Sequence, residues 1–129
     1  MATYIVLYKF TAEGAKNIRD SVKRAGRIRQ ENARVGFRII DVFWVQGEYD
    51  MISIVQAPSE EAMMGAMLNV VGAGNVSTTT MRAFDALEMS RILAQTPSLT
   101  GDEPAPAQKA AAAAPKDKPA PKKKAAKRK

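Results

Sequence analysis

The 129-residue chain contains no cysteine and no histidine. It therefore forms no disulfides and lacks the side chains that most often act as thiol nucleophiles, as general bases near neutral pH and as soft-metal ligands. We accordingly expect no metal site and no cofactor. The length suits one ordinary domain with an appendage, and the net charge of +7 divides unevenly, with +1 in residues 1–100 and +6 in residues 101–129.

The chain opens with an alternating apolar segment. Residues 3–9 predict a strand with apolar side chains on both faces. One face holds Ile5 and Leu7, and the other holds Tyr4, Val6 and Tyr8. Apolar residues follow Thr11 at nearly helical spacing, which predicts a helix that ends near Gly36. These residues are Ala15, Ile18, Val22, Ala25 and Ile28. Thr11 is a suitable N-cap for this helix.

Two apolar runs flank a glycine turn in the middle of the chain. Residues 37–45 and 51–56 predict a pair of antiparallel strands, with Gly47-Glu48 as a two-residue type II′ turn. Strict alternation in the first of these strands divides its side chains between two faces. Ile40, Val42 and Trp44 are expected on one face, and Ile39, Asp41, Phe43 and Val45 on the other.

The second half of the globular part repeats the order of helix and strand. Ser59 before two glutamates predicts the start of a second helix, and Gly72 and Gly74 predict its end. Residues 76–84 then predict a fourth strand, and residues 85–94 a short closing helix.

The predicted order, βαββαβ, defines a fold class. It gives a four-stranded antiparallel sheet with both main helices on one face, a ferredoxin-like α+β sandwich. The other sheet face would present either the set Tyr4, Val6 and Tyr8 or the alternate set of apolar side chains. Because exposed apolar patches of this size usually mark an interface, we expect the protein to associate with itself as a dimer or a higher oligomer.

Several short segments carry a family resemblance. They are residues 3–7, Phe10-Thr11 with Gly14, residues 20–24, Gly47-Glu48-Tyr49-Asp50, residues 57–61 and residues 74–84. In these segments and their order, the chain from Thr3 to Leu93 resembles the GYD domain family, small proteins of undetermined function that are similar to the dimeric α/β-barrel group. Two positions depart from the family pattern. Gln56 stands where an acidic residue is common, and Val22 stands where proline is frequent, which predicts a less kinked first helix.

The hairpin tip supplies three ligand-binding candidates, Glu48, Tyr49 and Asp50. Two carboxylates are too few for a dedicated metal cage. Turns commonly use aspartate to accept hydrogen bonds from backbone amides. A structural role for Asp50, with Glu48 exposed to solvent, therefore stands beside a ligand-binding role.

Arg24, Thr78 and Thr80 are the other ligand-binding candidates. Arg24 lies in a basic helix that is either a solvated surface or a patch for anions or nucleic acid. The face is formed by Lys16, Arg19, Lys23 and Arg27, partly balanced by Asp20 and Glu31. Thr78 and Thr80 either fill a β-branched strand or point hydroxyl groups into a cavity. No catalytic residue can be assigned.

The C-terminal segment has a different composition. Residues 97–129, rich in alanine, proline and lysine, predict a disordered tail behind a domain of residues 1–96. The nucleic-acid-binding candidates are the basic residues Lys122, Lys123, Lys124, Lys127, Arg128 and Lys129. Such a segment binds phosphate backbones through counterion release, or it serves only to keep the protein in solution.

Two functions stay open at this point. The first is a small oligomeric binding or regulatory module of unknown ligand, whose basic tail tethers it to nucleic acid or another polyanion. The alternative is a small enzyme of the dimeric α/β-barrel type with a pocket lined by Tyr, Thr and carboxylate groups. The absence of histidine favours the first function. No apolar stretch is long enough to span a membrane, and no charged segment precedes the first strand, so we expect a cytoplasmic protein that does not associate with membranes.

Overall fold

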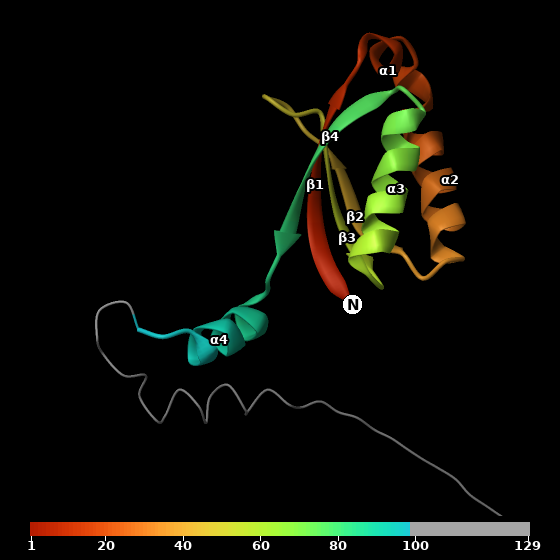
Figure 1. Ribbon diagram of the computed structural model, residues 1–129. Coiled ribbons are helices and arrows are strands. Elements are labelled where there is room, and N and C mark those ends of the chain that lie inside the picture. Colours follow the sequence, from red (N-terminus) through yellow and green to blue (C-terminus); the bar gives the residue numbers. More distant parts are fainter. Residues whose placement is uncertain (99–129) are drawn as a thin grey trace, which may run out of the picture. The chain divides into compact units, whose positions relative to one another are not determined.

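Four strands form one antiparallel sheet in the order β2-β3-β1-β4 (Figure 1). The central strands are β1 (Ala2–Phe10) and β3 (Met51–Ala57), and the edge strands are β2 (Arg38–Trp44) and β4 (Val76–Ala83). Both long helices cover the same face of this sheet (Figure 1). The computed structural model therefore has the predicted ferredoxin-like α+β architecture.

The structure describes residues 1–98, and the chain divides into two compact units, Met1–Ala83 and a second unit that starts at Phe84. In the second unit, α4 (Ala86–Gln95) begins with a capping box in which Asp85 and Glu88 each bind the other's backbone amide. The predicted closing helix is thus present. The predicted disorder of the tail falls, from residue 99 onward, outside the described residues, and the proposed boundary after residue 96 stays a prediction.

The prediction of one long first helix is wrong. The segment forms α1 (Ala12–Lys16), a short 3₁₀ helix η1 (Ile18–Asp20) and α2 (Ser21–Ala33). The break lies at Asn17, whose carbonyl oxygen accepts a hydrogen bond of 3.3 Å from the Arg24 guanidinium. The start of α2 is fixed separately, because the Trp44 indole N–H donates to Ser21 Oγ at 3.1 Å.

This break changes which residues of the segment face the sheet. Ile18 and Val22, predicted to lie on the apolar face, are exposed, whereas Ala25 and Ile28 are half-buried. The basic residues expected on one continuous face also belong to three separate helices. Glu31, expected to balance part of this positive charge, forms an ion pair with Arg27, with 3.9 Å between Nε and Oε1.

Both predicted helix starts are confirmed. Thr11 Oγ1 accepts a hydrogen bond from the Gly14 amide at 3.1 Å, and Ser59 Oγ accepts one from the Ala62 amide at 3.0 Å. The second of these caps begins α3 (Glu60–Gly72). Gly74 follows the helix with φ of +85°, a left-handed conformation that glycine adopts without strain.

A bulge in β2 overturns the predicted alternation of its side chains. The pairing of β2 with β3 shifts register between Ile39 and Asp41, because Ile40 is an extra residue on the bulged strand. Ile39 therefore shares the helix-covered face with Val42 and Trp44. Asp41 and Phe43 lie on the opposite face, as predicted.

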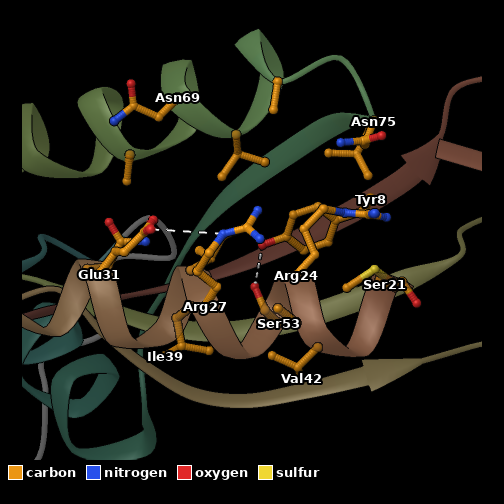
Figure 2. A pocket seen from close by; sticks show the side chains of 18 of the residues that line it. Tyr8, Ser21, Arg24, Arg27, Glu31, Ile39, Val42, Ser53, Asn69 and Asn75 are labelled. Atoms are coloured by element: carbon orange, nitrogen blue, oxygen red, sulfur yellow. Dashed lines mark hydrogen bonds and ion pairs between the residues drawn. The ribbon is translucent and has the colours of Figure 1, made fainter. Parts of the chain in front are cut away.

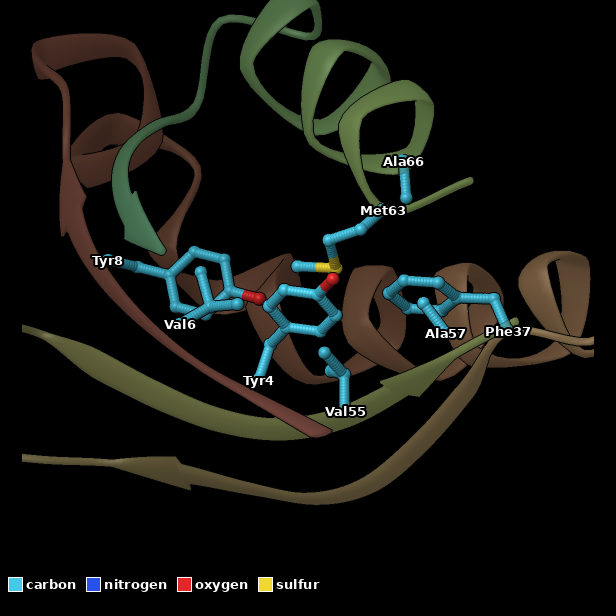
Figure 3. Close-up of a cluster of buried hydrophobic side chains, with 8 residues drawn as sticks. All are labelled: Tyr4, Val6, Tyr8, Phe37, Val55, Ala57, Met63 and Ala66. Atoms are coloured by element: carbon cyan, nitrogen blue, oxygen red, sulfur yellow. The ribbon is translucent and has the colours of Figure 1, made fainter. Parts of the chain in front are cut away.

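The hydrophobic core lies between the sheet and the helices (Figure 3). Its buried members are Tyr4, Val6, Tyr8, Phe37, Val55, Ala57, Met63 and Ala66. The alternation of β1 thus turns its aromatic set toward the helices. The opposite face of the sheet carries the alternate apolar set, which includes Ile5 and Leu7.

The hairpin between β2 and β3 keeps the predicted register but not the predicted turn. Strand pairing ends at Trp44 and Met51, and the Val45 amide donates to the Asp50 carbonyl oxygen at 2.9 Å. Gly47 has φ of +122°, whereas the first central residue of a type II′ turn has φ near +60°. A wider bend thus replaces the two-residue turn.

Candidate functional site: a cavity between the sheet and its helices

A cavity of about 480 Å³ opens between the sheet, α2 and α3 (Figure 2). Its sheet wall comes from β1, β2, β3 and the first residue of β4, and its helix walls come from α2 and α3. The lining residues are Tyr8, Phe10, Ser21, Arg24, Ala25, Arg27, Ile28, Glu31, Asn32, Val35, Ile39, Val42, Met51, Ser53, Ala66, Asn69, Val70, Ala73, Asn75 and Val76. The volume falls in the range of small-molecule sites.

A hydroxyl pair lies on the sheet wall of this cavity. Tyr8 Oη and Ser53 Oγ are 2.7 Å apart, and their residues are 9% and 1% exposed. Burial raises the pKa of the Tyr8 phenol above its ordinary value, and the hydrogen bond to Ser53 opposes part of that change. Tyr8 is therefore a neutral hydrogen-bonding group near neutral pH.

Two arginines of α2 supply the positive charge of the cavity. Figure 2 shows Arg24 and Arg27 extending from α2 into the space beside the Tyr8 ring. Glu31 is the one carboxylate in the lining, and it pairs with Arg27. The ionised lining groups therefore sum to one positive charge.

At the end of the cavity near Phe10, two hydrogen bonds join Thr11 to the loop before β4, and we call this junction the backbone corner. The Thr11 amide donates to the Asn75 carbonyl oxygen at 3.0 Å, and Thr11 Oγ1 donates to the Gly74 carbonyl oxygen at 2.6 Å. Gly14 is buried against this corner, where a Cβ atom would lie 1.9 Å from the Asn75 carbonyl oxygen. Glycine is required here by close approach of two backbones.

The hairpin candidates lie outside the lining of this cavity. The Asp50 carboxylate accepts a hydrogen bond of 2.7 Å from the Phe10 amide, and the Asp50 amide donates to the Tyr8 carbonyl oxygen at 2.8 Å. Tyr49 is half-buried, with Lys9 Nζ 5.3 Å from its ring centre, and Glu48 is exposed. Asp50 thus ties the hairpin to the end of β1.

Thr78 and Thr80 line a separate, more open apolar groove between α3 and β4, together with Tyr4. The Tyr4 hydroxyl is buried and has no hydrogen-bond partner among residues 1–98. Arg82, the residue opposite Tyr4 on β4, has its guanidinium carbon 5.8 Å from the Tyr4 ring centre. The two threonines and Arg24 therefore do not share a site.

Of the six predicted ligand-binding residues, Arg24 alone lines the larger cavity. The predicted nucleic-acid-binding residues lie outside the described part of the chain; they are Lys122, Lys123, Lys124, Lys127, Arg128 and Lys129. Sequence reasoning missed Ser53, Ser21 and Asn75. Ser53 had a signal, because it is the one polar residue of the apolar run from Met51 to Val55. Ser21 and Asn75 lie in segments that carry the family resemblance, but their contacts with Trp44 and Thr11 depend on residues distant in sequence.

Residues 1–98 hold no cluster of three or more acidic side chains suited to bind a metal ion. In the same part of the chain, no helix has the length and apolar character needed to cross a bilayer.

Fold and comparisons together place the chain among known proteins. Its ferredoxin-like unit is similar to part of the crystal structure of MtbAldR, with a TM-score of 0.53 at 18% identity over 65% of this chain and 53% of that one. The chain thus spans about half the length of MtbAldR. The sequence model of the GYD domain matches residues 4–93. The chain belongs to the GYD domain family, as its motifs predicted.

A curated relative and a second solved structure both come from Thermus thermophilus. The relative, a glutamine synthetase and cystathionine beta-lyase binding protein, is 31% identical over 90 residues, which are 69% of this chain and 95% of the relative. The second structure, TTHA0845, matches with a TM-score of 0.45 at 22% identity over 67% of this chain and 96% of that one.

Proposed function

We propose that this protein is an oligomeric module that binds other proteins and does not convert a substrate. The observation that carries the proposal is the apolar face of the sheet that points away from α2 and α3. The relative from Thermus thermophilus supports it, because that protein is named for its binding to two enzymes and matches this chain over 95% of its own length.

The apolar sheet face, as we call it, comprises Ile5, Leu7, Phe43, Ile52, Ile54 and Met81. The register of the four strands places these residues side by side, on the face opposite the core. Phe43 and Met81 are 51% and 41% exposed. Apolar patches of this kind usually mark protein contacts.

A second copy of the chain is the occupant that we propose for this face. Lys9 on β1 and Asp41 on β2 are exposed at its margin and carry opposite charges. A two-fold contact between identical faces is self-complementary, so each charge has an opposite partner available. The enzyme partners would then bind the assembled oligomer.

The chemistry of the cavity favours binding over catalysis. Burial moves the pKa of Tyr8 upward, away from neutrality, which weakens the phenol as a general acid or base at neutral pH. Glu31, the carboxylate of the lining, is engaged with Arg27. The described lining residues thus offer the enzyme alternative no histidine or cysteine and a single carboxylate, which pairs with Arg27.

The test replaces Phe43 by serine in the full-length protein. Light scattering should give at least a dimer for the wild type and a shift toward monomer for Phe43→Ser, since the substitution removes apolar contact area. Val22→Ser is the matched control, because Val22 is 67% exposed on α2. A wild-type protein that stays monomeric at tens of micromolar (roughly where a standard-size interface persists) would contradict self-association.

Partner binding is measured separately, with immobilised glutamine synthetase and cystathionine beta-lyase, each purified. We expect the wild type to bind at least one of them and the Phe43→Ser variant to bind more weakly, because the variant disrupts the oligomer. Absence of binding to both enzymes would restrict the proposal to self-association.

We further propose that the basic tail tethers the module to nucleic acid. Composition supports this, because residues 101–129 carry nine basic and three acidic residues. The full-length protein should bind duplex DNA without sequence preference, and affinity should fall steeply as salt rises. A chain that ends at residue 100 should lose this binding at about 150 mM salt, where exposed charges are screened beyond ~8 Å. Equal binding by both chains would reject the tether.

A further inference from the structure

The cavity beside Tyr8 has the polarity of a ligand site as well as the size of one. Its walls are largely apolar and include Ile28, Ile39, Val42 and Val70. Small-molecule sites combine such walls with a few polar groups that fix the orientation of the ligand. In this cavity the polar groups gather in two places, at the hydroxyl pair on the sheet wall and at the arginines of α2.

The hydroxyl pair has hydrogen-bonding capacity to spare. Tyr8 and Ser53 each bring one O–H group, and their mutual hydrogen bond uses one of the two protons. Neither side chain has a second partner among residues 1–98. One hydroxyl proton and several lone pairs are therefore available to a polar atom of a bound molecule.

The arginines have spare donors as well. Each guanidinium carries five N–H groups, of which Arg24 uses one on the Asn17 carbonyl oxygen. Arg27 is paired with Glu31 at 3.9 Å, through its Nε. The remaining donors of both arginines match the flat, two-oxygen geometry of a carboxylate.

We propose that this cavity binds a small carboxylic acid with an apolar body, whose carboxylate pairs with Arg24 and Arg27. The apolar body of the ligand occupies the space between Ile28, Val42 and Val70, and a polar substituent on it reaches the Tyr8–Ser53 pair. All lining residues belong to the Met1–Ala83 unit. The site is therefore complete in one subunit and does not depend on the proposed protein contacts.

The probe is phenylbutyrate, and its neutral analogue phenylbutanol isolates the carboxylate. Calorimetric titration of the full-length protein should show the acid binding at least about tenfold more tightly than the alcohol, because charge-assisted hydrogen bonds form only with the acid. Equal affinities for the two compounds, or no binding of either at millimolar concentration, would overturn the proposal.

Four substitutions locate the bound probe. Arg24→Gln and Arg27→Gln should each weaken phenylbutyrate about tenfold and leave phenylbutanol unchanged. Arg29→Gln is the matched control, because Arg29 is an exposed residue of α2 outside the lining. Ala25→Leu adds bulk inside the cavity and should weaken both compounds.

The four variants distinguish binding of the probe in the cavity from binding elsewhere on the protein. If Ala25→Leu leaves both affinities unchanged, the probe binds elsewhere, for example on the apolar sheet face, and the proposal fails. If Arg29→Gln weakens phenylbutyrate as much as the other arginine substitutions do, the attraction is non-specific and the proposal also fails. Circular dichroism checks the fold of each variant. Should Arg24→Gln unfold the protein by freeing Asn17, Arg27→Gln decides in its place.

Discussion

The layer between the sheet and its helices is filled at one end and hollow at the other. At the filled end, Phe37, Val55, Ala57 and Met63 are at most 3% exposed and pack together (Figure 3). At the hollow end, the Tyr8–Ser53 pair faces the cavity (Figure 2). The same sheet supports both ends, so the difference arises from the helices.

The two helices are held on the sheet in different ways. α3 contributes Met63 and Ala66 to the buried core, whereas the buried residue of α2 is Ser21. Polar contacts fix the start of α2, namely Trp44 to Ser21 and Arg24 to Asn17. Because these contacts do not require tight packing, α2 can lie over the sheet without filling the space beneath it.

The largest expected effect contrasts one residue from each end. Phe37→Ala should lower the free energy of unfolding by about 4 kcal/mol, since it leaves a cavity in a packed region. Val42→Ala, beside the existing cavity, should cost only about 1 kcal/mol, because few packing contacts are lost. Urea unfolding measures both. Equal costs would show that the two ends are packed alike.

The next effect concerns the corner that closes the hollow end. Gly14→Ala should destabilise the protein by about 3 kcal/mol, because the new Cβ atom collides with the Asn75 carbonyl oxygen and separates the two backbones. Gly26→Ala is the control within α2, where a Cβ atom meets nothing within 4 Å. That substitution should stabilise the helix by about 0.5–1 kcal/mol. The two substitutions should shift the midpoint of thermal unfolding in opposite directions, and shifts in the same direction would contradict this prediction.

A smaller effect is expected at the hairpin beside the hollow end. Asp50→Ala should cost about 2 kcal/mol, since the Phe10 amide loses a charged acceptor at 2.7 Å. Glu48→Ala, at an exposed position, should stay within about 0.5 kcal/mol of the wild type. Unchanged unfolding midpoints for both variants would remove the structural role of Asp50 and strengthen a ligand-binding role.

The filled end follows from local sequence signals more directly than the hollow end does. Alternation in β1 and β3 and the cap Ser59 predict the sheet and the start of α3, because each depends on neighbouring residues. In β2 the alternation is ambiguous, since Ile39 and Ile40 are both apolar and either can face the core. The bulge that settles it comes from pairing with β3.

Local sequence signals predict neither the break in the first helix nor the cavity. Asn17 ends α1 in the middle of an apparently continuous helical pattern, and the contact that fixes α2 joins Ser21 to Trp44, 23 residues away. The cavity is the volume that side chains leave unfilled, which no single residue encodes. Arg24 was identified as a binding candidate from its charge alone, without its partner residues.

The smallest expected effect tests the hydroxyl pair of the hollow end. Tyr8→Phe should cost about 1 kcal/mol at neutral pH, because it leaves the buried Ser53 hydroxyl without its partner. The cost should shrink at high pH. The folded-state pKa of Tyr8 is raised above the ordinary value of 10.0. Above that pH the phenol therefore ionises more readily in the unfolded chain than in the folded one. This lowers the free energy of unfolding of the wild type, whereas the variant has no phenol at this position and does not undergo this change. Arg24, Arg27 and Glu31 also line the cavity but are unchanged in the variant, so the difference between the two proteins isolates Tyr8. Urea unfolding at pH 7 and at roughly pH 11 measures this difference, and a stability gap that stays constant or widens with pH would show that Tyr8 is not buried as a neutral phenol.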